Sequence, residues 1–201
     1  MSEKRIEGVV AAVLAGGSGS RIGGEKATAQ LDGRSLISYP LEAALGAVEQ
    51  VVVVAKSDGA LPEDLGSGVE LWTEPGEPRH PVIGVIEALR RAQGRAVVVI
   101  ACDLPLLTSK TVAVVASADA EGSVAVLASA AGRPQPLLAR YEPAALTPLE
   151  QFDTDGPMTE QVMALMPTLV EVPVEASFNV NDLEQLKEVS RRLRSSSEQA
   201  E

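Results

Sequence analysis

The chain has 201 residues, with 17 Lys and Arg against 28 Asp and Glu, which gives a formal net charge of −11. This acidic surplus argues against a nonspecific nucleic-acid or anionic-membrane binder, because such proteins use basic patches to neutralise phosphate. The length favours one domain, expected to span residues 1–195 and to be followed by a frayed polar tail at 196–201. With 45% hydrophobic residues the chain can bury a sizeable core.

The single cysteine, Cys102, excludes an intrachain disulfide framework and a multi-cysteine zinc site. The single histidine, His80, has no companion for a zinc site or a catalytic triad. The first seven residues are too polar for a signal peptide, and the longest apolar runs are too short to span a membrane. We therefore expect a soluble, cytoplasmic protein, monomeric or weakly homo-oligomeric, that binds neither nucleic acid nor membranes.

Short Val-rich runs alternate with segments of helical spacing over the first 130 residues. Continuous apolar runs of this length are typical of strands buried on both faces of a mainly parallel sheet. The alternation predicts an α/β fold, with a Rossmann-like doubly wound sheet and helices on both faces. The expected strands lie at 9–15, 50–55, 69–73, 96–101 and 123–129, and the expected helices at 36–48, 82–89 and 108–115.

The pattern loosens after residue 130, where prolines become frequent. Pro134 and Pro136 predict that the strand at 135–141 lies on an edge of the sheet, because proline cannot donate to a strand ladder. Two short helices and a strand at 168–172 are expected to follow. The last element is an amphipathic helix at 182–194, which Asn181 or Asp182 would cap.

A glycine-rich loop follows the first expected strand and ends at Lys26. Five glycines among residues 16–24 let the backbone turn tightly and present N–H groups to an anion, and Arg21 and Lys26 add positive charge. Ligands of open parallel sheets lie at the carboxyl ends of the strands, so this loop is well placed to bind one.

Three kinds of phosphate loop compete for this segment. A P-loop is excluded because Glu25 separates the last glycine from Lys26, and Ala27 follows where Ser or Thr is needed. The dinucleotide fingerprint fails because Ile22 replaces the third glycine, although a variant spacing remains permissible. A nucleotidyltransferase loop, in which both cations meet a triphosphate, fits best, and a plain surface turn is the alternative without function.

Two further groups of polar residues lie where strands are expected to end. Asp103 follows the strand at 96–101, where its carboxylate could hold Mg²⁺ against a triphosphate or merely cap a turn. Asn179 and Asn181 stand before the last helix and point the same way, as a pair of oxygen ligands would. Asn181 could equally serve as a helix cap.

Taken together, these motifs resemble those of the molybdenum cofactor guanylyltransferases and related NTP-transferase-like enzymes. The loop from Leu14 to Ala27 is similar to the family's first motif, and its Gly16-Gly17 pair resembles guanylyltransferases more than the related cytidylyltransferases. The resemblance covers most of residues 8–193. It recurs in the family's order at Thr73-Glu74-Pro75, Pro81-Val82-Ile83-Gly84, Cys102-Asp103-Leu104-Pro105, Arg133-Pro134-Gln135-Pro136 and Phe178-Asn179-Val180-Asn181.

The resemblance implies that GMP is transferred from GTP to the phosphate of molybdopterin with the help of Mg²⁺ and with release of pyrophosphate. It implies catalytic roles for Arg21, Lys26 and Asp103, and metal contacts for Asp103 and Asn181. Acceptor contacts would come from Arg133, Gln135, Asn179 and Asn181. Nucleotide contacts would come from Leu14, Ala15, Gly16, Gly17, Gly19, Arg21, Lys26, Glu74 and Asp103.

The chain departs from the family pattern in two places. Val54 stands where the family often has an Asn that reads guanine, and residues 155–159 lack the arginine of the family's Arg-Ser stretch. Three alternatives therefore stay open: a cytidylyltransferase, a sugar-phosphate nucleotidyltransferase, and a non-catalytic nucleotide-binding protein of the same fold. An NAD(P)-binding oxidoreductase is the least favoured reading.

Overall fold

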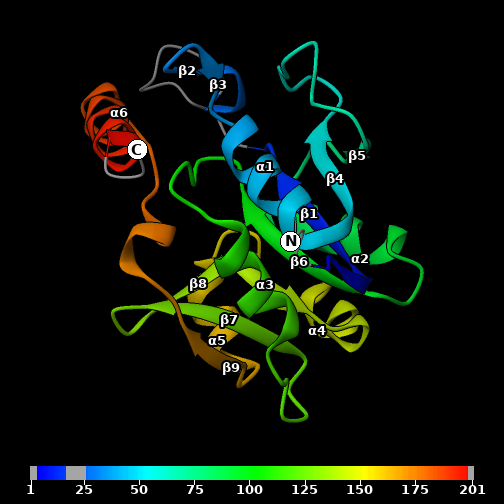
Figure 1. Cartoon of the computed structure of the whole chain (residues 1–201). Helices are drawn as coiled ribbons and strands as arrows, with labels where there is room; N and C mark the ends of the chain where they lie inside the picture. The colour runs from blue at the N-terminus through cyan, green and yellow to red at the C-terminus, as the bar shows by residue number, and fades with distance from the viewer. Residues whose placement is uncertain (1–3, 17–25, 199–201) are drawn as a thin grey trace.

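The computed structural model describes residues 4–16 and 26–198, with side chains as far as residue 195. Within these residues one seven-stranded sheet has the strand order β5-β4-β1-β6-β8-β7-β9 (Figure 1). Only β8 runs antiparallel to its neighbours, so the sheet is mainly parallel, as the sequence predicts. The strands are β1 (Ile6–Leu14), β4 (Val48–Lys56), β5 (Val69–Glu74), β6 (Ala96–Ala101), β7 (Ala125–Ala130), β8 (Arg133–Tyr141) and β9 (Thr168–Glu171).

Helices cover both faces of this sheet. Along β1, successive side chains alternate between the two faces, so that Val10 packs on one face and Ala11 on the other. One face packs against α1 (Ser38–Ala47) and α3 (Ser109–Ser117). The other packs against α2 (Pro81–Arg91), α4 (Leu146–Leu149) and α5 (Met158–Ala164). The expected doubly wound architecture is confirmed.

The position of β8 corrects one prediction, because this strand lies between β6 and β7 and not at an edge. The prolines are accommodated since β8 is longer than its contact with β6, which uses only the stretch from Leu138 to Tyr141. Pro134 and Pro136 precede that stretch, and the ladder with β7 has an irregularity between Leu127 and Ala128. The true edges are β5 and β9.

A short hairpin follows the glycine loop and is formed by β2 (Gln30–Leu31) and β3 (Arg34–Ser35). Its turn, Asp32-Gly33, has φ values of 48° and 80°, the left-handed conformation that a two-residue hairpin turn requires. The hairpin packs against the last helix, α6 (Leu183–Glu198), which lies beside it and away from the main sheet (Figure 1). Their small apolar contact, called here the satellite core, buries Leu31, Leu36, Val180 and Val189.

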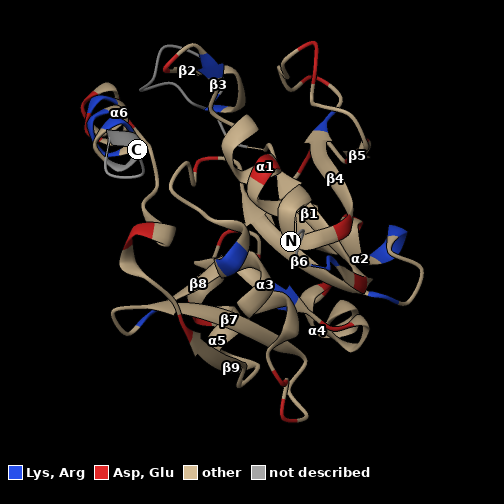
Figure 2. Ribbon diagram, viewed as in Figure 1, with Lys and Arg blue, Asp and Glu red and all other residues tan. Residues whose placement is uncertain are grey.

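Charged residues lie mostly on helices and loops, and the middle of the sheet carries few of them (Figure 2). Short 3₁₀ turns at Lys26–Thr28, Pro143–Ala145 and Val174–Ser177 complete the described elements. In the described part of the chain, no helix is both long enough and apolar enough to cross a membrane.

Candidate nucleotide site

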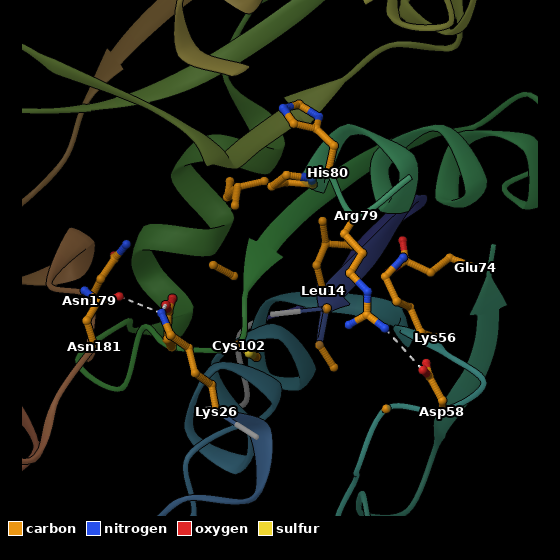
Figure 3. Close-up of a pocket in the computed structure, with 17 residues that line it drawn as sticks. Leu14, Lys26, Lys56, Asp58, Glu74, Arg79, His80, Cys102, Asn179 and Asn181 are labelled. Atoms are coloured by element: carbon orange, nitrogen blue, oxygen red, sulfur yellow. Dashed lines mark hydrogen bonds and ion pairs between the residues drawn. The ribbon is translucent and has the colours of Figure 1, made fainter. Parts of the chain in front are cut away.

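A cavity of about 450 Å³ opens at the carboxyl ends of β1, β4, β5 and β6 (Figure 3). This is the edge of the sheet at which the strand directions predict a ligand. Its wall combines backbone from the start of the glycine loop with charged side chains from the strand ends. The lining residues are Leu14, Ala15, Gly16, Lys26, Lys56, Asp58, Gly59, Glu74, Arg79, His80, Pro81, Ala101, Cys102, Asp103, Leu137, Asn179 and Asn181.

Lys26 joins two of the expected site residues on one side of this cavity. Its Nζ donates to Asp103 Oδ2 at 2.7 Å and to Asn181 Oδ1 at 2.6 Å (Figure 3). The side chains of Lys26 and Asp103 are only 19% and 10% exposed, so this ion pair is well shielded from water. Three segments that are far apart in the sequence therefore converge on one ammonium group.

Two backbone hydrogen bonds fix the position of Asp103. The N–H of Cys102 donates to the carbonyl of Leu14, which ties the end of β6 to β1. The carbonyl of Asp103 accepts from the N–H of Val180, which ties it to the segment before α6. The carboxylate is buried, and its Oδ1 has no hydrogen-bond partner among the described residues. A buried acceptor of this kind is costly unless a ligand completes it.

The unpaired oxygen fits a Mg²⁺ ion that takes few ligands from the protein. Mg²⁺ is commonly held by one or two carboxylates, with phosphate oxygens and waters completing the octahedron. Within residues 4–16 and 26–195 no three His, Cys, Asp or Glu side chains form a ready-made cage for a metal. Asp103 could thus hold the ion together with phosphate oxygens of a substrate. Asn181 Oδ1 accepts from the same Lys26 ammonium as Asp103 and is therefore a second oxygen close to this position.

Glu74 lines the opposite side of the cavity and is buried, with 7% of its surface exposed. Its Oε1 lies 3.6 Å from Nζ of Lys56, which also donates to the carbonyl of Pro75 at 2.8 Å. Burial raises the pKa of the Glu74 carboxyl above its ordinary value, and the positive charge of Lys56 opposes this rise. Lys56 therefore helps to keep an acidic group ionised inside the wall.

Two glycines make room for the Glu74 carboxylate. A Cβ at Gly16 would lie 2.7 Å from Oε1, and a Cβ at Gly84 would lie 2.9 Å from Oε2. Gly84 belongs to α2, where glycine is otherwise unfavourable, so its presence is explained by this close approach. The carboxylate is thus confined between the end of β1 and α2.

The rim of the cavity is formed by the segments after β4 and β5. Arg79 Nη2 lies 3.4 Å from Asp58 Oδ2, and this exposed ion pair connects the two segments (Figure 3). His80 lines the cavity, but its Nδ1 already accepts from the N–H of Val82 and caps α2. The histidine therefore has a local structural task.

Most of the expected site residues that the structure describes meet in this cavity. Those are Leu14, Ala15, Gly16, Lys26, Glu74, Asp103, Asn179 and Asn181. Gly17, Gly19 and Arg21 lie outside the described residues. Arg133 and Gln135 do not line the cavity: Arg133 is exposed at the start of β8, and the Gln135 side chain donates to its carbonyl. Their contact with an acceptor stays a prediction.

Sequence reasoning did not name several residues of the wall, among them Lys56, Asp58, Arg79 and Leu137. Lys56 ends β4, so the rule that ligands lie at strand ends could have found it. Val54, two residues earlier, is completely buried in the core and does not line the cavity. Nothing in the sequence pointed to Leu137 as a cavity residue, because the strand that carries it was predicted to lie at an edge of the sheet.

The chain is similar in sequence to a family of nucleotidyltransferases and to several of its curated members. The sequence matches the MobA-like NTP transferase domain over residues 11–169. It is 31% identical over 131 residues to a Bacillus subtilis (strain 168) protein described as a probable molybdenum cofactor guanylyltransferase, and the match covers 64% of each chain. It is 29% identical over 146 residues to the molybdenum cofactor guanylyltransferase of Shewanella halifaxensis (strain HAW-EB4), with 72% of each chain covered. The match thus spans just under two thirds of the Bacillus protein's length.

Solved structures share the fold over almost the whole chain. Molybdopterin-guanine dinucleotide biosynthesis protein A from Archaeoglobus fulgidus superposes with a TM-score of 0.70 at 24% identity, covering 92% of this chain and 99% of that one. A nucleotidyl transferase from Methanothermobacter superposes with a TM-score of 0.75 at 20% identity, covering 94% and 100%. Asn179 and Asn181 of the cavity lie beyond the residues that the domain matches. Since the match over residues 11–169 covers most of the chain, this chain belongs to the MobA-like NTP transferase family.

Proposed function

We propose that this chain transfers GMP from GTP to the phosphate of molybdopterin and releases pyrophosphate. The observation that carries the proposal is the shielded Lys26–Asp103 pair at the strand ends, with one carboxylate oxygen left unpaired among the described residues. A cation for phosphate and a carboxylate for a phosphate-bound metal are the two charges that nucleotidyl transfer needs side by side. The names of the curated relatives supply guanine and the acceptor.

In this reaction an oxygen of the acceptor phosphate attacks the α-phosphorus of the nucleotide. A phosphorus–oxygen bond to the acceptor forms, the bond to the bridging oxygen breaks, and pyrophosphate leaves with the electron pair. A phosphate nucleophile is already ionised at pH 7, so the site needs no general base. This agrees with the task of His80, the histidine of the wall, which caps α2. Catalysis then depends on positioning and on neutralising charge.

Asp103, with Asn181 beside it, would hold Mg²⁺ in this site, and the ion would supply positive charge for the phosphate oxygens. Lys26 would move from its carboxylate partner towards the β- and γ-phosphates as these bind. Together with Arg21 it would then stabilise the pyrophosphate that departs. Leu14, Ala15 and Gly16, which line the cavity, would contact the nucleotide.

The pair formed by Glu74 and Lys56 supports guanine as the base. Guanine presents a carbonyl acceptor beside N–H donors along one edge, and its O6 acceptor and 2-amino group distinguish it from adenine, which has a 6-amino donor instead. The Glu74 carboxylate can accept from the donors, while the Lys56 ammonium can donate to the carbonyl. Cytosine offers the opposite pattern on a smaller ring, so a cytidylyltransferase is the competing candidate.

The direct test is incubation of the protein with GTP, Mg²⁺ and molybdopterin, followed by measurement of pyrophosphate and of the dinucleotide product. Parallel reactions with CTP, and with a sugar 1-phosphate in place of molybdopterin, separate the alternatives. We expect GTP and molybdopterin to give the highest turnover. Nucleotide binding without pyrophosphate release in any reaction would contradict the proposal and favour a non-catalytic binding protein.

A further inference from the structure

The satellite core lies where the three segments that carry Lys26, Asp103 and Asn181 come together. Ala29 and Leu31 follow Lys26, Leu106 follows Asp103, and Val180 precedes Asn181; all four side chains pack in this cluster. α6 closes the cluster from outside, through Val189 and the partly buried Leu186 and Leu193. A helix that makes little contact with the main sheet therefore packs behind the site (Figure 1).

The first turn of α6 holds Asn181 through the side chain of Gln185. Asp182 Oδ1 accepts from the N–H of Gln185, and Gln185 Oε1 accepts from the N–H of Asn181 at 2.7 Å. The Asp182 bond is an N-terminal cap, and Gln185 reaches one residue further back than in a standard capping box, so both bonds depend on the first turn of α6 being formed. The Asn181 side chain then accepts from Lys26. The N-terminus of α6 is thus connected to the ammonium group through one residue.

A second contact joins the other end of α6 to the hairpin. Asp32, in the hairpin turn, accepts from Ser190 and from Arg194, both at 2.7 Å. These contacts lower the pKa of the Asp32 carboxyl, the Arg194 hydrogen bond most of all. Arg194 is one of several basic residues on α6, where Figure 2 shows them gathered. The hairpin is therefore attached to α6 by an apolar contact and by charge.

The two ends of the Lys26 contact are anchored differently. Ala27, next to Lys26, packs in the main core, and so does Leu104, next to Asp103. Asn181 follows Val180, whose N–H bonds to Asp103 but whose side chain packs in the satellite core, and the N–H of Asn181 itself bonds to Gln185 of α6. The position of Asn181 is thus the one that depends on α6.

We propose that α6 is a positioning element of the nucleotide site: docked on the β2–β3 hairpin, it holds Asn181 against Lys26. Asp32 and Val189 are then positioning residues, since they touch no cavity atom but keep the helix docked. When α6 undocks, Asn181 leaves Lys26 and the hairpin loses its cover, while the main sheet stays folded. The expected change in the KM for GTP rests on the proposed nucleotide transfer. The expected loss of the Asn181–Lys26 contact does not.

Val189→Asp tests the proposal, because an unpaired carboxylate at this fully buried position is costly and so favours undocking of α6. The matched control is Lys187→Asp, at an exposed position of the same helix. Amide hydrogen exchange is followed without nucleotide at Leu36 and Val180, whose N–H groups bond to Ala29 and Asp103, and at β1 and β4. Initial rates with varied GTP are measured in parallel.

We expect Val189→Asp to speed exchange at Leu36 and Val180 by roughly tenfold or more, as loss of apolar burial predicts, with β1 and β4 unchanged. The KM for GTP should rise in Val189→Asp. In the Lys187→Asp control it should stay close to the wild-type value. If Val189→Asp does not fold, Val189→Ala and Asp32→Asn give the same pattern in smaller measure. Fast exchange along α6 with wild-type protection at Leu36 and Val180 would overturn the inference. A wild-type protein that releases no pyrophosphate would instead refute the proposed function alone.

Discussion

Lys56 and Glu74 are the last paired residues of the parallel strands β4 and β5, and Lys56 Nζ lies 3.6 Å from Glu74 Oε1. Adjacent parallel strands end at the same edge, so this pairing delivers both side chains to one cavity wall. The carboxylate is buried between two glycines, and Lys56 is the cation within ion-pair distance among the described residues. The protonation of Glu74 and the space around it are therefore measurable properties of the site.

We predict that Glu74→Gln changes the pH dependence of stability. Burial raises the folded-state pKa of Glu74 above its ordinary value of 4.5, so between these two pKa values the folded protein binds more protons than the unfolded one. The wild-type free energy of unfolding, relative to Glu74→Gln, should thus fall as the pH rises through that range. Urea unfolding of both proteins at a series of pH values measures this difference.

Lys56→Met serves as the companion variant in that experiment. It removes the charge that opposes the rise in the Glu74 pKa, so the fall in relative stability should extend to higher pH. A stability difference between wild type and Glu74→Gln that stays constant with pH would show that Glu74 is not held in a desolvated site.

We predict that Gly84→Ala weakens GTP binding without unfolding the protein. A Cβ at Gly84 would approach Oε2 of Glu74 to 2.9 Å and Leu14 to 3.2 Å, so both must move. Alanine is also favoured over glycine in a helix by about 0.5–1 kcal/mol, which offsets part of the strain. We expect the KM for GTP to rise roughly tenfold, because small displacements of positioning groups are costly, with little change in melting temperature.

The matched test for Gly84→Ala is the double variant with Glu74→Asp. Aspartate draws the carboxylate back by one methylene group and so makes room for the new Cβ. The double variant should bind GTP better than Gly84→Ala alone, which a steric cause requires. If the double variant instead binds GTP more weakly than Gly84→Ala, the contact between Gly84 and Glu74 does not set the affinity.

The sequence predicted the parts of this fold that depend on local pattern. Continuous Val-rich runs identified the parallel strands, and the rule on strand ends pointed to Asp103, which lines the cavity, whereas Glu74 was named only through the family resemblance. The position of β8 could not be inferred, because proline disturbs a ladder only where its missing N–H would have bonded, and Pro134 is tolerated opposite Ser129 of β7. Here Pro134 and Pro136 precede the stretch that pairs with β6.

The partners of the site residues were also beyond the sequence. Glycine is needed at position 84 because Glu74 lies against it. This contact arises where α2 packs on β5, and such tertiary packing cannot be read from the local sequence. The same holds for Asp32, which lies in the hairpin turn and bonds to Arg194, 162 residues later. Local pattern specifies which residues can do chemistry, and long-range packing decides which of them meet.

We predict that Lys26→Ala and Asp103→Asn each lower the rate of pyrophosphate release by about 10²–10³, the usual cost of one charge contact in a transition state. Both variants should keep a cooperative thermal transition, since neither side chain belongs to an apolar core. Lys110→Ala, at an exposed lysine of α3, is the control for loss of one positive charge. Turnover near that of wild type in either site variant, at saturating GTP and Mg²⁺, would refute the assignment of this pair.

The final prediction concerns removal of the metal. The chain carries a net charge of −11, and the buried Asp103 carboxylate adds local repulsion, so a triphosphate needs a cation beside it to bind. GTP at about 100 times its Kd should raise the melting temperature by roughly 5–10 °C with Mg²⁺ present, and EDTA should remove most of that rise.

Asp103→Asn makes this prediction specific to one carboxylate. The variant loses a ligand for Mg²⁺, but it also loses the repulsion and frees Lys26 from its ion pair. In EDTA, Asp103→Asn should therefore bind GTP more tightly than wild type does, whereas in Mg²⁺ the order should reverse. Such a reversal requires that the metal and the carboxylate act at the same point on the nucleotide. Weaker binding by the variant in both buffers would mean that Asp103 contacts the nucleotide without a metal between them.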